Sequence, residues 1–173
     1  IEPAGAVTCG RLQRLRDRFA QEADLTIVAP CPHRRPCPLP AAHCGFCHDV
    51  RSWRVPDSVS LVNRRLFRSV QDLKYGLLVL QRTPATGVVA DDTRCRLVAP
   101  LHRAKGRLVT RGCCGDGTLR EIELPTRGLN HAKIDALCAH DRGARLRLVN
   151  PRLLGDGRTW RAESLEPIET ITQ

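Results

Sequence analysis

Aromatic residues are scarce in this sequence, which has three phenylalanines, two tryptophans and one tyrosine among 173 residues. So few rings give little support to a nucleic-acid-binding module that stacks bases on a sheet of aromatic side chains. No apolar stretch approaches the roughly 20 residues that a membrane-spanning helix needs. The chain has no methionine and begins with Ile1, so we expect a processed protein or a fragment, in which a targeting segment would not be seen.

Recognisable catalytic and nucleotide-binding motifs are also missing. The sequence contains no G-x-G-x-x-G, P-loop, H-E-x-x-H or G-x-S-x-G pattern, and these are the signatures of dinucleotide binding, phosphate binding, zinc proteases and α/β-hydrolases. No pair of side chains stands out as a catalytic acid and base. The residues alone therefore support no catalytic site.

Positive charge, in contrast, is abundant. The chain has 28 lysines and arginines against 18 aspartates and glutamates, with a formal net charge of +10 and a pI near 9.7. Arginine greatly outnumbers lysine, and its planar guanidinium suits phosphates and bases. We expect an acidic partner, with nucleic acid first and a membrane surface second. The alternative explanation is a GC-rich genome that favours arginine codons.

The first half of the chain has the pattern of a piece of an α/β sheet. Thr8 is the expected N-cap of a first helix. The apolar residues Leu12, Leu15 and Phe19 recur at helical spacing after it. Residues 25–29 are apolar except for Thr26, as in a buried parallel strand. Ligand-binding loops commonly follow the carboxyl ends of such strands.

A second, basic helix is expected between residues 50 and 74. It is either a solvated amphipathic helix or a surface that faces RNA. Its apolar residues at the spacing of one helical face are Val62, Leu66, Val70 and Leu73. Residues 75–80 then read as a second buried strand, which completes a first domain over residues 1–83.

Residues 84–173 form the second predicted domain and are β-rich. A loop at 83–92 with proline, glycine and two acidic residues marks the boundary. The segment Gly115–Gly117 is typical of a hairpin turn. The expected elements are strands at 94–99, 107–111, 118–124 and 145–149 and a short helix at 132–139. The tail beyond residue 151 has no clear pattern.

Cysteine and proline are concentrated in the loop 31–48. Its four cysteines have the spacing C-x5-C-x6-C-x2-C, as Cys31, Cys37, Cys44 and Cys47. Two of them precede proline, which favours rigid, extended turns. The loop has little apolar material to offset its ordering entropy, so we expect a metal centre. The odd total of nine cysteines favours a reducing compartment over a disulfide scaffold.

The spacing does not decide which metal binds. Cys44 and Cys47 fit the C-x2–4-C pairs of zinc ribbons, whereas iron–sulfur clusters accept longer loops between thiolates. His33, His43 and His48 could also be ligands, although each alone is typical of a polar loop residue. The alternative is a proline-rich turn with free thiols.

The other cysteines lie outside this loop. Cys113 and Cys114 are adjacent at the expected hairpin, where one of them would complete a site if the hairpin folded over the loop. Cys9, Cys95 and Cys138 are expected to be buried as small hydrophobes.

Several motifs occur in the order found in one protein family. They are Ile1-Glu-Pro-Ala-Gly, Val28-Ala-Pro-Cys-Pro-His33, Cys37-Pro-Leu39, Cys44-Gly-Phe46, Tyr75-Gly-Leu-Leu-Val-Leu80 and Lys105-Gly-Arg-Leu-Val-Thr-Arg-Gly-Cys-Cys-Gly-Asp-Gly117. Over roughly residues 1–150, the chain thus resembles the methyltransferase-like assembly proteins of the mitochondrial small ribosomal subunit and their bacterial relatives.

The resemblance implies the C-terminal half of a class I methyltransferase-like (Rossmann-type) sheet, with a cysteine-rich metal loop and a small β-rich C-terminal region. It also implies a 4Fe-4S cluster, for which zinc is the alternative. Cys47 falls where the family usually has another residue, and His43 stands in place of a tryptophan. The glycine-rich S-adenosylmethionine motif would lie before residue 1, so cofactor binding by this chain is unsupported. The implied cluster ligands are Cys31, Cys37, Cys44 and Cys113.

The favoured hypothesis is a non-enzymatic assembly factor that binds small-subunit rRNA and ribosomal proteins, and neither DNA nor a membrane. The expected location is the mitochondrial matrix, with the bacterial cytoplasm as the alternative. The residues expected to contact RNA are Arg34, Arg35, Arg51, Arg54, Arg64, Arg65, Arg68 and Lys105.

Three other functions compete with this one. The chain could be part of an S-adenosylmethionine-dependent rRNA methyltransferase, which activity with that cofactor would establish. It could be a zinc-stabilised RNA-binding module, which would be colourless and contain zinc. A redox enzyme is the least supported, because the sequence shows no second cofactor site or substrate pocket.

Overall fold

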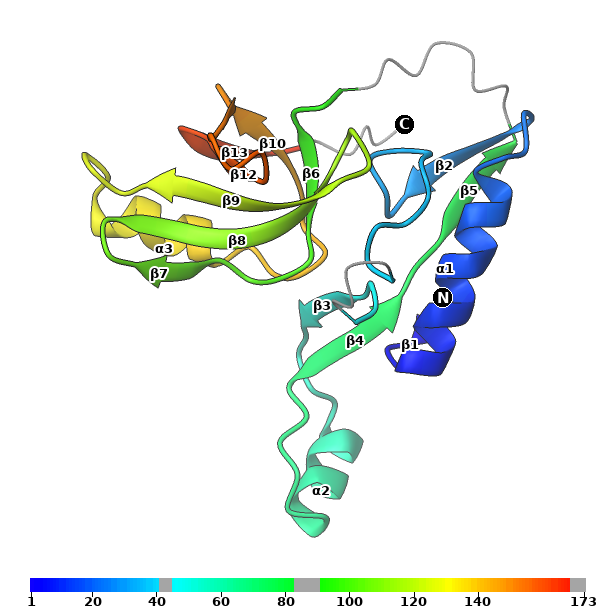
Figure 1. The fold of residues 1–173 in the computed structure, drawn as a ribbon. Helices are drawn as coiled ribbons and strands as arrows, with labels where there is room; N and C mark the ends of the chain where they lie inside the picture. The colour runs from blue at the N-terminus through cyan, green and yellow to red at the C-terminus, as the bar shows by residue number, and fades with distance from the viewer. Residues whose placement is uncertain (41–44, 83–90, 169–173) are drawn as a thin grey trace.

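The computed structural model describes residues 1–40, 45–82 and 91–168 of the chain. In these residues the protein is α/β, with a curled mixed sheet, two smaller antiparallel sheets and three helices (Figure 1). This architecture is compatible with a Rossmann-like fold. No helix in this part of the chain is long and apolar enough to cross a membrane.

The N-terminal elements form the two smaller sheets. The elements are β1 (Glu2–Pro3), α1 (Ala6–Phe19), β2 (Leu25–Ala29), β3 (Asp49–Ser52), α2 (Asp57–Arg65), β4 (Asp72–Gly76) and β5 (Val79–Arg82). β4 lies between β1 and β3 and is antiparallel to both, and β2 pairs antiparallel with β5. Only Leu77 and Leu78 separate β4 from β5, so this segment joins the two sheets.

The C-terminal elements form the curled sheet. They are β6 (Arg94–Leu97), β7 (His102–Ala104), β8 (Arg107–Cys114), β9 (Leu119–Pro125), α3 (His131–Cys138), β10 (Arg145–Val149), β11 (Arg152–Leu153), β12 (Thr159–Arg161) and β13 (Ser164–Pro167). The strand order is β11-β12-β9-β8-β6-β10-β13, and β7 pairs with β8. The β9–β12 pair is parallel and the others are antiparallel.

The curled sheet encloses the main hydrophobic core. Alternate residues of its strands point inward, as the period of a strand requires. Leu97, Leu108, Cys114, Ile122 and Leu124 are each completely removed from solvent. Full burial of such a side chain contributes about 1.5–3 kcal/mol, so this half has the material to fold around its own core.

The N-terminal half has far fewer buried apolar side chains. Those in residues 1–40 and 45–82 are Cys9, Ile27, Ala29 and Leu39. Three polar or charged side chains, Arg16, His33 and Asp49, are buried there as well. This half is therefore held together largely by polar contacts, which converge on the loop after β2.

Several expectations for the N-terminal half need correction. The first helix begins after Gly5, and Thr8 is inside it, where its Oγ1 donates to the Pro3 carbonyl oxygen at 2.6 Å. Leu15 is exposed, whereas Cys9 and Arg16 are the buried residues of α1. The helix buries a mixed face because that face lies against a cysteine-rich loop.

The strand predicted at 25–29 and the second predicted helix also differ from expectation. β2 is antiparallel to its partner, and Val28 is exposed between buried Ile27 and Ala29, because one face of this pair is covered and the other is open. α2 ends at Arg65, and Phe67 has φ of +50°. The chain cannot continue as a helix through that left-handed conformation. Three of the four predicted face residues, Leu66, Val70 and Leu73, therefore lie outside α2.

The C-terminal prediction is closer to the structure. The strand predicted at 94–99, the two strands predicted around the Gly115–Gly117 turn, the strand at 145–149 and the short helix correspond in order to β6, β8, β9, β10 and α3. The tail contains three short strands, β11 to β13, which the sequence pattern does not reveal. Most of the predicted boundary loop lies outside the described residues, and the division into two domains stays a prediction.

Candidate metal centre

Five cysteines line one pocket between the N-terminal elements and the curled sheet. One is Cys9 of α1, and the other four, which we call the pocket thiols, come from the loop after β2 and from β8. Cys31 and Cys37 follow β2, Cys47 precedes β3, and Cys113 lies at the end of β8. Every pair among these four thiols is close enough to interact electrostatically. We call this site the cysteine pocket.

Strand alternation explains why one of two adjacent cysteines reaches the pocket. Successive side chains of a strand point to opposite faces. Cys113 packs with Leu39 of the loop, while Cys114 is in the core of the curled sheet. Their partners on β6 follow the same rule, because Arg96 lies opposite Cys113 and Cys95 lies opposite Cys114. β8 thus contributes one cysteine to each side of the sheet.

Helix α1 forms the wall facing β8. Cys9, Leu12, Gln13 and Arg16 all line the cysteine pocket, and their spacing of three and four residues places them on one helical face. The helix and the loop are also joined directly, because Asp17 Oδ1 accepts a hydrogen bond of 3.0 Å from the backbone N–H of Cys37. The loop is therefore fixed at its backbone as well as by its side chains.

Each pocket thiol receives a hydrogen bond from a different nitrogen donor. The donors are Arg16 to Cys31, Gln13 to Cys37 at 3.7 Å, Arg96 to Cys47, and His33 to Cys113 at 3.2 Å. Hydrogen bonds of this kind stabilise sulfur in its anionic form and tune a metal bound to it. Each of these four sulfurs thus has a nitrogen donor within the fold.

His33 is held in one tautomer by its neighbours. Burial and, after it, the nearby charge of Arg16 lower its pKa to about 4, so the ring is neutral at physiological pH. Arg16 has no acceptor, and its Nη2 lies 3.2 Å from His33 Nδ1. Nδ1 must therefore accept, which leaves the proton on Nε2, where it is donated to Cys113.

Arg96 is a buried cation between the two halves of the protein. Its Nη2 forms an ion pair of 2.7 Å with Oδ2 of Asp49, and both side chains are buried. Gly143 lies directly against this aspartate with φ of +95°, and a Cβ there would meet the Asp49 Oδ1 at 2.2 Å. A glycine is required at this position both for its backbone angle and for the close approach.

The thiols of the pocket are protonated in the absence of a metal. Burial raises the pKa of Cys31, Cys37, Cys47 and Cys113. The positive charges of Arg16 and Arg96 oppose this effect at Cys31, and Arg96 opposes it at Cys47. A metal ion would displace these protons, as thiolate ligation requires.

The predicted ligand set is partly assembled here. Cys31, Cys37 and Cys113 line the pocket together, Cys44 lies outside the described residues, and Cys47 takes a place beside the other three. Two thiolates on one zinc ion lie within about 4 Å of each other, because a Zn–S bond is about 2.3 Å. Across residues 1–40, 45–82 and 91–168, no three His, Cys, Asp or Glu side chains are arranged so that they could hold a metal ion. Metal binding therefore stays a prediction.

The predicted RNA-contacting residues fall in different environments. The Arg34 side chain is used within the protein, because it donates hydrogen bonds to the carbonyl oxygens of Ala20, Glu22 and Leu25. The other seven side chains are exposed. Five of these come from residues 51–68 around α2, while Arg35 is in the cysteine-rich loop and Lys105 is in the β7–β8 turn. Their contact with RNA stays a prediction.

The polar partners of the pocket were missed by sequence reasoning. Arg16 and Arg96 read as ordinary surface arginines, since one is in a basic helix and the other alternates with apolar residues in a strand. His33 was weighed as a ligand and is instead a hydrogen-bond donor to Cys113. The remaining free cysteines behave much as expected: Cys9 and Cys95 are buried, and Cys138 is half-buried. No local signal in the sequence distinguishes a buried arginine from an exposed one.

Comparison with known families agrees with this structure. No curated protein matches the sequence. A family model described as mitochondrial small ribosomal subunit Rsm22 matches residues 1–148, which include the cysteine loop, α2 and the strands that carry Cys113 and Arg96. That description ties the family to the small subunit of the mitochondrial ribosome and suggests a mitochondrial location. With most of its length matched, the chain belongs to the mitochondrial small ribosomal subunit Rsm22 family.

Proposed function

We propose that this protein is an assembly factor of the mitochondrial small ribosomal subunit, which acts in the matrix by binding rRNA and neighbouring ribosomal proteins. In this proposal residues 1–82 are the C-terminal half of a class I methyltransferase-like sheet that serves binding rather than catalysis. A 4Fe-4S cluster, held by Cys31, Cys37, Cys47 and Cys113, ties the loop after β2 to the curled sheet.

One observation carries the metal proposal, namely the convergence of four thiols on a pocket with a nitrogen donor for each. A 4Fe-4S cluster takes four thiolates. Its ligands belong to separate iron atoms, so they need not come as close together as the ligands of one zinc ion. Four thiolates around such a cluster carry negative charge, and the buried cations Arg16 and Arg96 would compensate it.

When bound, the cluster would cross-link segments that are distant in sequence, namely the loop after β2 and strand β8. The chain's own residues do the rest: Asp17 holds the Cys37 backbone, Arg96 holds Asp49, and the donors of the pocket orient the sulfurs. The cross-link would stabilise an N-terminal half that has few buried apolar side chains. Loss of the cluster would therefore release the loop and the surface beside it.

The family supports the ribosomal part of the proposal, and the charge supports RNA as the target. A net charge of +10 gives a strong sequence-independent attraction to phosphates. Seven of the eight arginines and lysines predicted to contact RNA have exposed side chains.

The first experiment is anaerobic purification followed by an absorption spectrum and iron, sulfide and zinc analysis. A brown protein with about four irons and four sulfides per chain is the expected result. Colourless protein with about one zinc would replace the cluster with a zinc-bound module. A protein that contains neither iron nor zinc would overturn the metal proposal. Methyl transfer from S-adenosylmethionine to rRNA would replace the binding role with catalysis.

The choice of ligand is tested by two serine variants of the same loop. Cys47→Ser is expected to lose iron and absorbance, and Cys44→Ser is expected to retain both. The reverse pattern would restore Cys44 as the ligand. For the distant ligand, Cys113→Ser is compared with Cys114→Ala, since the second removes a thiol from the opposite face of the same strand.

A further inference from the structure

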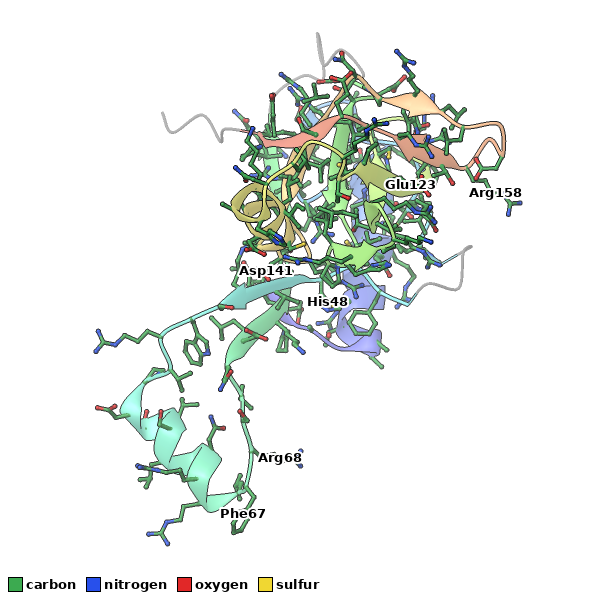
Figure 2. All side chains as sticks on the ribbon, turned by 90° about the vertical axis from the view of Figure 1, so that its left-hand side faces the viewer. His48, Phe67, Arg68, Glu123, Asp141 and Arg158 are labelled. Carbon is green, nitrogen blue, oxygen red and sulfur yellow. The ribbon has the colours of Figure 1, made fainter. Side chains whose placement is uncertain are left out.

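Residues 53–71 form an arm that projects away from the rest of the protein. The arm connects β3 to β4, contains α2, and extends well beyond the two sheets (Figure 1). α2 has no buried residue. Figure 2 shows Phe67 and Arg68 at the far end of the arm, opposite the region that carries Glu123 and Arg158.

The tip of the arm is a defined turn. The backbone N–H of Arg68 donates to the Asn63 carbonyl oxygen at 2.8 Å, and the Asn63 side-chain Nδ2 donates to the Val70 carbonyl oxygen at 3.2 Å. These bonds join the helix to the returning chain. They hold Phe67 at φ of +50°, a conformation that bulky residues rarely adopt.

The turn displays an aromatic ring to solvent. Phe67 is 97% exposed, in a protein that has three phenylalanines. Other exposed apolar residues of the arm are Leu61, Val62, Leu66 and Val70. Exposed apolar groups that cluster in this way mark a binding surface, and strained backbone is often retained where function needs it.

The charge of the arm indicates the partner. Arg54, Arg64, Arg65 and Arg68 are exposed, and none of the four makes a side-chain hydrogen bond or ion pair within the described part of the chain. Asp57 is the one acidic residue between 53 and 71. Arginines elsewhere are commonly paired, as in Arg120–Asp116, Arg103–Asp135 and Arg161–Glu123.

We propose that the arm is an RNA-binding element in which Phe67 stacks on an unpaired base and Arg64, Arg65 and Arg68 contact the neighbouring phosphates. The proposal rests on the rRNA-binding role above and assigns it to this surface. Single-stranded loops are recognised by stacking on aromatic side chains together with arginine contacts. A ring at the end of a basic arm has the reach to enter such a loop, and the positive charge complements the backbone.

The test uses the full chain and two matched RNAs, one a small-subunit rRNA hairpin with a 2-aminopurine in its loop and the other a fully paired duplex. Phe67→Ala is expected to weaken binding to the hairpin about tenfold or more, from the worth of one stacked base. It should abolish quenching of the 2-aminopurine and leave both the duplex affinity and the salt dependence unchanged. Phe67→Trp should restore binding.

The arginines are tested against a control of equal charge. Arg64→Gln/Arg65→Gln/Arg68→Gln is expected to lower the slope of log affinity against log salt by about 2, since each phosphate contact on a single strand contributes about 0.7. The control, Arg127→Gln/Arg152→Gln/Arg158→Gln, removes three exposed arginines from the curled sheet. It should change the slope much less.

Several outcomes would overturn the assignment. They are normal hairpin binding by Phe67→Ala, equal losses from the two triple variants, or an arm variant that loses binding to anionic lipid vesicles or to a ribosomal protein and not to RNA. In each case a wild-type chain that still binds rRNA would leave the assembly role standing. A wild-type chain that binds no rRNA would remove that role as well.

Discussion

The two halves of this protein are stabilised in different ways. The curled sheet packs Leu97, Leu108, Ile122 and Leu124 into an apolar core. The N-terminal half instead buries an arginine, a histidine and an aspartate beside four thiols. An apolar core is stable by itself, whereas a buried polar network depends on every partner being present. The N-terminal half is therefore the part whose folding a ligand can control.

Metal removal should give the largest contrast between the halves. We expect oxidation and chelation of the cluster to abolish the amide hydrogen-exchange protection of residues 1–40 and 45–82. The strands β8 and β9 should remain protected, because their apolar core contains none of the four proposed cluster ligands. The measurement is hydrogen exchange by mass spectrometry before and after removal. Equal loss across both halves would show that they fold as one unit.

The buried pair Arg96–Asp49 should have the next largest effect. Arg96→Met removes the buried partner of the Asp49 carboxylate and leaves only the exposed Arg51, 3.6 Å away. Loss of a buried partner costs about 3–5 kcal/mol. The double variant Arg96→Met/Asp49→Asn should recover much of that loss, because no charge is left unpaired. Urea unfolding gives the free energies. Equal destabilisation by the single and double variants would contradict the account of the pair as a charge partnership.

The arm should contribute least to stability. Leu66 is exposed on the arm, so Leu66→Ser is expected to change the free energy of unfolding by less than about 0.5 kcal/mol. Leu124→Ala in the core of the curled sheet is the comparison, with an expected loss of about 2–5 kcal/mol. Thermal unfolding of both variants checks the difference. A large loss from Leu66→Ser would mean that the arm packs against the protein in solution.

The parts predicted well from sequence are those governed by local rules. The Gly115–Gly117 hairpin and its strands follow from turn chemistry and from the alternation of apolar and polar residues. The cysteine loop was recognised from its composition alone. The resemblance supplied Cys113 as the distant partner, which the structure brings to the same pocket as Cys31 and Cys37.

The parts predicted poorly depend on contacts between distant segments. Arg96 is buried because Asp49 and Cys47 meet it from another sheet, and neither lies near it in sequence. The second helix was predicted too long because helical spacing continues past Arg65, while the left-handed Phe67 ends the helix. The antiparallel direction of β2 likewise depends on β5, more than 50 residues away.

The position of Cys113 has a consequence for the newly made chain. Protein synthesis produces Cys31, Cys37 and Cys47 well before Cys113 and Arg96, which lie side by side on β8 and β6. The side of the pocket formed by β6 and β8 is therefore missing until the ribosome has synthesised β8. A polypeptide truncated before that strand would carry three of the thiols with nothing to enclose them, so the pocket can close only after β8 has been made.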